Sequence, residues 1–146
     1  MSDTDVLMRL IVATLLGGLV GMERQIHHKP AGLRTHILVC IGACMCMLIG
    51  LSLNKEFGEG IDPSRIAAQV VSGIGFLGAG TIMVTKASVK GLTTAASIWA
   101  TSALGLAIGN GMFFAASVAA VIMVTVLLVF EFIEEKLALK ASDENE

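Results

Sequence analysis

The sequence predicts an all-α, polytopic membrane protein with five transmembrane helices. Of its 146 residues, 55% are hydrophobic and 15% are charged, against about 25% charged in soluble domains. The apolar residues gather in long runs, each near a multiple of the roughly 20 residues that cross a bilayer as one helix. The polar segments between them are too short for a soluble core. We expect one transmembrane domain at residues 1–135 and an acidic cytoplasmic tail at 136–146.

The first predicted span covers residues 6–22, and Arg9 lies near enough to its start to reach the headgroups. Gly17 and Gly21 form a GxxxG pair, which indicates close packing against another helix. Pro30, in the polar segment that follows, ends the helical run. No cleavable signal peptide is apparent, because the chain opens with acidic residues where a secretory signal would be basic.

The second predicted span, residues 35–53, contains three cysteines, Cys40, Cys44 and Cys46. Cysteines within one apolar run do not form a disulfide framework, and buried free cysteine behaves as a small hydrophobic residue. Because methionines alternate with them, a site for a soft metal such as Cu(I) is the alternative. Cys40 and Cys44 share a helix face whereas Cys46 points elsewhere, so packing is the favoured interpretation.

The third predicted span, residues 63–85, starts with Asp62 as N-cap and Pro63 at the first helical position. It contains G-x-G-x-x-G at Gly73, Gly75 and Gly78, which in a soluble protein indicates a dinucleotide-binding loop. That loop precedes a helix, whereas these glycines lie inside one that is uncharged over 20 residues. We therefore interpret them as a surface for close packing between helices.

The last two spans come from the 40 uncharged residues of 91–130, which suffice for two crossings. The triplet Gly109, Asn110 and Gly111 favours a tight turn, so we place the spans at 92–108 and 112–133. The fourth span carries small or hydroxylated residues at every fourth position, from Thr93 to Gly109, and this face is expected to meet another helix. The fifth span is mostly aliphatic and is expected to face lipid.

Lysine and arginine near the ends of the spans predict the orientation, since cytoplasmic loops carry an excess of both. An external N-terminus and an internal C-terminus place seven basic residues inside and three outside. Net charge is −2 and the basic residues are scattered, so no nucleic-acid partner is expected. The expected surroundings are the lipid bilayer.

Two groups of polar residues are candidates for function, because ionisable groups are costly in a membrane. At the outer end, Arg65, Gln69 and Ser72 fall on one helix face, either as a functional pocket or as a helix end anchored by an Asp62–Arg65 pair. At the inner end, Glu23 and Arg24 meet Arg34 and Thr35. An interfacial ion-pair cluster is favoured there, and a site for an anion or a partner loop is the alternative.

Neither group predicts catalysis. A magnesium site normally needs one or two carboxylates, and no acidic pair lies buried along one helix. No nucleophile and base are paired, so we expect no enzyme activity, no cofactor and no metal site. The histidines His27, His28 and His36 offer a titration near neutral pH as an alternative, but solvated loop residues are the favoured interpretation of His27 and His28.

Four segments of the chain resemble the MgtC/SapB family of bacterial inner-membrane proteins. They are GGLVGMERQ at 17–25, GLRTH at 32–36, DPSRIAAQVVSGIGFLGAGTI at 62–82 and VKGLTTAASIWATSALGLAIGNG at 89–111. The resemblance implies a role in magnesium homeostasis under magnesium limitation and in virulence, and in some relatives restraint of the F-type ATP synthase. It also implies an ACT-like domain in longer members, which we do not expect here.

The resemblance marks a set of motif positions as functional candidates without assigning each a role. They are Glu23, Arg24, Arg34, Thr35, Asp62, Arg65, Gln69, Ser72, Lys90, Thr93, Thr94, Ser97, Trp99 and Asn110. The small residues expected at helix contacts are Gly17, Gly21, Gly73, Gly75, Gly78, Ala79, Gly80, Gly105 and Gly109.

We expect a homodimer in the bacterial inner (plasma) membrane, with helices one, three and four packed around a polar centre. The favoured function is regulation of another membrane protein, such as ATP synthase, through helix contacts. The alternative is a transporter or channel for an ion or small solute, favoured by the polar stripe of helix three and the hydroxyls of helix four. A soft-metal sensor built on the cysteines is a third hypothesis.

Overall fold

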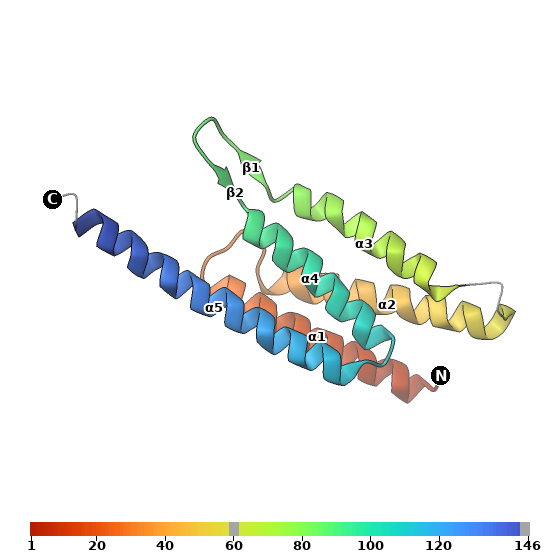
Figure 1. Cartoon of the computed structure of the whole chain (residues 1–146). Helices are drawn as coiled ribbons and strands as arrows, with labels where there is room; N and C mark the ends of the chain where they lie inside the picture. The colour runs from red at the N-terminus through yellow and green to blue at the C-terminus, as the bar shows by residue number, and fades with distance from the viewer. Residues whose placement is uncertain (59–61, 144–146) are drawn as a thin grey trace.

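The computed structural model describes residues 1–58 and 62–143, and over these residues the chain forms five helices and one short β-hairpin (Figure 1). The elements are α1 Asp3–Ile26, α2 Leu33–Phe57, α3 Pro63–Ala79, β1 Met83–Val84, β2 Val89–Lys90, α4 Leu92–Gly109 and α5 Phe113–Asp143. The predicted all-α class is confirmed.

Four helices are long and apolar enough to cross a membrane: α1, α2, α4 and the part of α5 from Phe113 to Ile133. The chain is therefore a multi-pass membrane protein. The fifth helix, α3, has 17 residues, and at about 1.5 Å per residue it falls short of the roughly 30 Å hydrocarbon core.

The predicted third span, residues 63–85, was too long as a helix. Asp62 and Pro63 start α3 as expected, but the helix ends at Ala79, six residues before Thr85. The amide and the hydroxyl of Thr81 both donate to the carbonyl of Gly78, at 3.0 and 2.8 Å, and so satisfy one of the carbonyls of the last turn. Beyond it, β-branched residues favour extended backbone, and β1 pairs with β2 in antiparallel fashion with Met83 opposite Lys90.

The centre of the bundle is α2, which packs against both α1 and α4. Helix α4 lies between α3 on one side and α5 on the other (Figure 1). The expectation that helices one, three and four surround the centre was therefore wrong for α3, which sits at the edge. The core is a run of small and aliphatic residues: Ala13, Val20, Cys40, Cys44, Leu48, Leu104, Ile108, Ala116 and Ala120.

Glycines let α1 and α4 approach α2 closely. A Cβ atom built on Gly17 would lie 2.7 Å from the Cβ of Cys40, and one on Gly109 would lie 2.7 Å from the carbonyl oxygen of Cys44. A Cβ on Gly105 would collide with the carbonyl of Cys40. The two cysteines are thus packing residues enclosed from both sides, and Cys46 on another face is partly exposed.

The glycines of α3 behave differently. Nothing lies within 4 Å of a Cβ built on Gly73 or Gly75, whereas one on Gly78 meets Ala95 of α4 at 3.5 Å. Phe76, on the same outward side, is 87% exposed. One face of α3 therefore has no partner among the described residues of this chain.

Candidate functional site

Ion pairs link the last turn of α1 to α5. Glu23 and Arg24 are 5% and 2% exposed, and the Nε and Nη2 atoms of Arg24 donate to the two carboxylate oxygens of Glu23. Arg24 Nη2 also lies 3.5 Å from Glu131 of α5, and Lys29 Nζ lies 2.8 Å from the other oxygen of Glu131. Each buried charge thus has a partner, and without one it would cost several kcal/mol.

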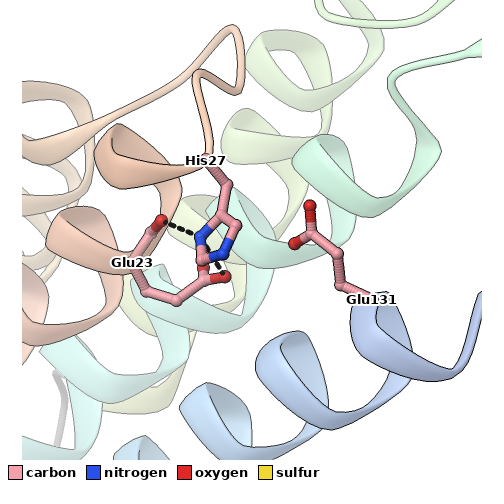
Figure 2. Close-up of side chains that lie close together, drawn as sticks. All are labelled: Glu23, His27 and Glu131. Carbon is pink, nitrogen blue, oxygen red and sulfur yellow. Dashed lines mark hydrogen bonds and ion pairs between the residues drawn. The ribbon is translucent and has the colours of Figure 1, made fainter. Parts of the chain in front are cut away.

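His27 adds an imidazole nitrogen to the carboxylate oxygens of this cluster. Its Nδ1 lies 3.3 Å from the Glu23 carboxylate and 2.9 Å from the Glu23 carbonyl oxygen. Figure 2 shows Glu131 facing both residues from α5. One ligand atom from each of Glu23, His27 and Glu131 lies within 4.8 Å of the others, so the three could hold a metal ion.

The cations around this trio compete with a metal. Arg24 engages Glu23 through two nitrogens, while Lys29 and Arg24 both approach Glu131. A divalent ion would have to displace guanidinium and ammonium groups that already neutralise the carboxylates. The geometry therefore favours a closed ion-pair cluster, as the sequence predicted for Glu23 and Arg24 at this end.

A pocket of about 720 Å³ opens beside the ion pairs, between α1, the hairpin, α4 and α5. Its polar lining comes from Arg24, Lys29, Lys90, Thr93, Thr94 and Glu131. Arg34 and Thr35 line a second pocket, of about 540 Å³, next to the α1–α2 loop. Arg24 and Arg34 therefore serve different cavities, and the structure does not bring them together as the forked anion site considered from the sequence.

A buried hydrogen-bond chain joins α2 to α4 close by. His36 is fully buried; its Nδ1 lies 2.9 Å from the carbonyl oxygen of Gly32, and its Nε2 lies 3.1 Å from the hydroxyl of Ser97. The Gly32 carbonyl can only accept, so Nδ1 carries a proton and donates to it, while the single hydroxyl proton of Ser97 points either to Nε2 of a neutral ring or to the Thr94 carbonyl. Ser97 also lies 2.9 Å from the Thr94 carbonyl. One predicted candidate, Ser97, thus contacts a histidine that joins α4 to α2.

The α3 candidates lie apart from this cluster. Asp62 caps the helix by accepting from the amide of Ser64 at 2.8 Å and from its hydroxyl at 2.7 Å. These bonds to Ser64 lower the pKa of the Asp62 carboxyl. Arg65, Gln69 and Ser72 are exposed on the outer side of α3. Within the described residues Arg65 makes no ion pair, so the predicted Asp62–Arg65 pair is not formed.

Two candidates lie elsewhere on the molecule. Trp99 is half exposed on α4, and Asn110 caps the C-terminus of α4 at the turn into α5. Close to that turn, Arg9 donates to the carbonyl of Gly109 at 2.6 Å while pairing with Asp5. Rather than only extending toward headgroups, Arg9 thus ties the N-terminus of α1 to the end of α4.

The sequence pattern did not point to Lys29 or Glu131, although both complete the ion-pair cluster. Glu131 is the first charged residue after 40 uncharged ones, and an ionisable group at such a position is a functional candidate. That signal was present in the sequence. The contact between Glu131 and α1 could not be predicted from the sequence, because it depends on how α5 packs.

Comparison with known proteins identifies relatives over most of the chain. The profile described as the MgtC family matches residues 10–136. "Putative magnesium transporter YhiD" of Escherichia coli (strain K12) is 47% identical over 133 residues, covering 86% of this chain and 60% of its own length. "Protein MgtC" of Brucella abortus (strain 2308) is 46% identical over 78% of this chain and 46% of its own.

"Protein SapB" of Bacillus subtilis (strain 168) is 40% identical over 76% of this chain and 50% of its own length. The chain thus spans about half to three-fifths of the curated relatives it matches. No solved structure matches it.

Proposed function

This chain belongs to the MgtC family, and we propose on that basis that it acts in the bacterial inner membrane during acclimation to low magnesium. It does so as a regulator that contacts another membrane protein, such as the F-type ATP synthase. Support comes from the family resemblance and from the magnesium in the name of the Escherichia coli relative.

The outward face of α3 is the observation that carries this proposal. It combines open glycines, Gly73 and Gly75, with the exposed ring of Phe76. Small residues beside an exposed aromatic ring allow a second helix to approach closely, as in membrane helix pairs. In this bundle, α1 and α4 use their glycines against α2, whereas Gly73 and Gly75 of α3 meet no other described residue within 4 Å.

The polar residues of the same face also favour a partner. Arg65, Gln69 and Ser72 share the exposed side of α3, and the described structure gives their side chains no hydrogen bond. Polar groups that face lipid without a partner are costly. A partner helix with acceptors at the same depth would remove that cost and set the register of the contact.

Photocrosslinking from α3 tests the regulator. A photoreactive amino acid replaces Phe76, which is 87% exposed, and in the matched control it replaces Phe114 of α5, which is 84% exposed. Under magnesium limitation we expect position 76, and not 114, to crosslink to one membrane protein, identified by mass spectrometry. Crosslinks to lipid alone at both positions would overturn the proposal.

The same experiment bears on the predicted homodimer. If α3 joins two copies, position 76 crosslinks to a second copy of this chain and the product has twice the mass. That result supports the homodimer and counts against a regulatory contact on this face. Enlarging Gly75 to leucine is then expected to abolish the dimer without unfolding the monomer, because no described residue lies within 4 Å of a Cβ atom built there.

Transport of an ion or small solute is the second candidate. The name of the Escherichia coli relative favours it, as do the buried hydroxyls of Thr94, Ser97, Thr101 and Ser102 on α4. The two pockets described above lie at one end and include none of the polar residues of α3. Proteoliposomes that carry magnesium no faster than empty vesicles would exclude magnesium transport.

A further inference from the structure

The pocket beside the ion pairs is lined by positively charged side chains that the ion pairs do not fully neutralise. Arg24, Lys29 and Lys90 line it against a single carboxylate, Glu131. Glu23, which does not line the pocket, pairs with Arg24, and Glu131 pairs with Lys29 at 2.8 Å. Among the described residues Lys90 makes no ion pair. One positive charge therefore faces the pocket uncompensated.

The N-terminus of α4 opens into the same pocket. Gly91, at the N-cap, has φ of 90° and supplies no side-chain cap. Within the described chain the amides of Leu92, Thr93 and Thr94 have no backbone acceptor, since the first bond of this helix runs from Ala95 to Gly91. Free amides and the helix dipole at such a terminus favour a negatively charged ligand.

Gly91 is required for this arrangement. A Cβ atom there would collide with the carbonyl oxygen of Thr81, and its positive φ suits glycine. The backbone of the hairpin is thereby held against the start of α4. Lys90, the last residue of β2, is placed directly before the free amides.

The hydroxyl of Thr94 is a second, independent indication of a ligand. Thr94 is 3% exposed and lines the pocket, yet its hydroxyl has no hydrogen-bond partner among the described residues. No fully enclosed side-chain oxygen or nitrogen of the described residues lacks a partner. The hydroxyl must therefore keep its contact with open space, and the space available to it is the pocket.

We propose that this pocket binds a phosphate group, held by the amides at the start of α4, the Thr94 hydroxyl and the Lys90 ammonium. These donors suit an anionic oxygen, whereas a cation would face uncompensated positive charge. The Glu131 carboxylate limits the affinity and places the phosphate on the α4 side of the pocket. This site is separate from the face of α3, so the two proposals stand or fall independently.

The remaining lining indicates which molecules could present the phosphate. Val126, Leu127 and Phe130 of α5 and Leu92 of α4 form an apolar wall, and Phe130 is 58% exposed. An acyl chain could lie along that wall while its headgroup reaches Lys90. The shared chemistry is a phosphate ester or free phosphate, and the lipid form uses more of the surface.

Binding to the purified chain tests this site. In nanodiscs of phosphatidylcholine, phosphatidylglycerol is titrated in and its retention is followed by native mass spectrometry; in detergent, inorganic phosphate is titrated by calorimetry. Lys90→Gln and Thr94→Val are each expected to weaken binding about tenfold, since a hydrogen bond to a charged group is worth at least about 1.4 kcal/mol, a factor of roughly ten. Glu131→Gln is expected to tighten it about threefold.

Matched controls separate this site from general surface charge. Lys86→Gln removes a lysine of the same hairpin that does not line the pocket, and Thr125→Val removes an exposed hydroxyl of α5. Both should bind as the unchanged chain does. Circular dichroism and gel filtration verify that every variant is folded.

Each outcome of these binding experiments either supports or overturns the phosphate site. Phosphatidylglycerol retention that depends on Lys90 and Thr94 supports a lipid headgroup site, and inorganic phosphate binding with the same dependence supports a soluble phosphate compound. Absence of binding by both probes overturns the proposal. So does an equal loss in Lys86→Gln and Lys90→Gln, which would reduce the effect to nonspecific surface charge.

Discussion

Arg24 shows how a charged residue can be kept inside a membrane protein. Its guanidinium is 2% exposed because α1 ends against α5 at this level. The fork of the guanidinium matches the two oxygens of Glu23, a geometry that lysine does not offer. Removing either partner would leave a charge with fewer contacts in a poorly solvated place.

Replacing Glu23 by glutamine is therefore predicted to destabilise the fold. Glutamine removes the negative charge and one of the two acceptor oxygens, so the ion pair left to Arg24 would be the 3.5 Å contact with Glu131, and breaking a buried ion pair costs about 3 kcal/mol. Unfolding in mixed detergent micelles, followed by circular dichroism, measures the loss. Glu56→Gln, at an exposed residue near the end of α2, is the control.

A double variant, Glu23→Gln with Arg24→Met, separates charge from shape. It removes both charges at once and is expected to be more stable than Glu23→Gln alone, because it contains no buried guanidinium that has lost its main carboxylate partner. If the double variant were as unstable as the sum of the two single variants, the ion pair would not be the cause.

Asp62 makes the start of α3 sensitive to acid. Its pKa is lowered by the bonds from Ser64, first from the hydroxyl and then from the amide. A lowered folded-state pKa means that the cap contributes above the ordinary value of 3.8 and that this contribution is lost as pH falls through the folded-state pKa. Ser64→Ala is predicted to raise the pKa, as read from the carboxyl ¹³C shift of Asp62. A titration of the unchanged chain at the ordinary value would contradict this.

At the scale of elements, two kinds of glycine occur in similar small-residue patterns. Those of α1 and α4 are in contact with α2, and those at positions 73 and 75 of α3 are open. The sequence pattern alone does not distinguish them, because GxxxG describes a face and not its neighbour. The central position of α2 follows from Cys40, Ala43 and Cys44, whose small side chains accept a glycine face from either side.

This difference predicts opposite results for the same substitution. Gly105→Ala places a methyl group against the Cys40 carbonyl and Ala43, and overpacking of this kind costs about 2 kcal/mol. Gly75→Ala meets nothing within 4 Å and is expected to leave the monomer as stable or slightly more so, since alanine favours helix. Thermal unfolding in detergent compares the two. Equal losses in the two variants would contradict this account, because helix propensity alone would stabilise both.

At the scale of the whole molecule, the two ends of the bundle differ in character. The end of α1, the hairpin that carries Lys86 and Lys90, and the later part of α5 lie at one end, and the N-terminus lies at the other (Figure 1). The excess of lysine and arginine at the hairpin end is the signature of a cytoplasmic surface. The predicted orientation, with the N-terminus outside, is consistent with this distribution and stays a prediction.

Labelling of single cysteines tests that orientation. In a chain whose three native cysteines are replaced by alanine, Lys86→Cys is expected to react with a membrane-impermeant maleimide only after the inner membrane is broken. Lys55→Cys, near the end of α2, is expected to react from the periplasmic side without it. The reverse pattern would place the phosphate pocket and the ion-pair cluster outside the cell.

Several features of the molecule could be predicted from the order of residues alone. They are the number and type of helices, the cap of α3 by Asp62 and Pro63, the turn at Asn110 and the family. The structural features depend on local propensity and on apolar run length, which are properties of neighbouring residues. The sequence also predicted that Glu23 and Arg24 belong to an ion-pair cluster at the inner end of the helices.

Other features emerged only when the helices were seen packed together: which helix is central, where α3 ends, and which residues join Glu23 and Arg24. Glu131 reaches Arg24 across 107 positions and Ser97 reaches His36 across 61. Such contacts depend on how closely helix backbones approach, which the packing of Gly17, Gly105 and Gly109 around α2 sets. The sequence shows which face of a helix is made of small residues. Only the folded structure shows which helix packs against that face.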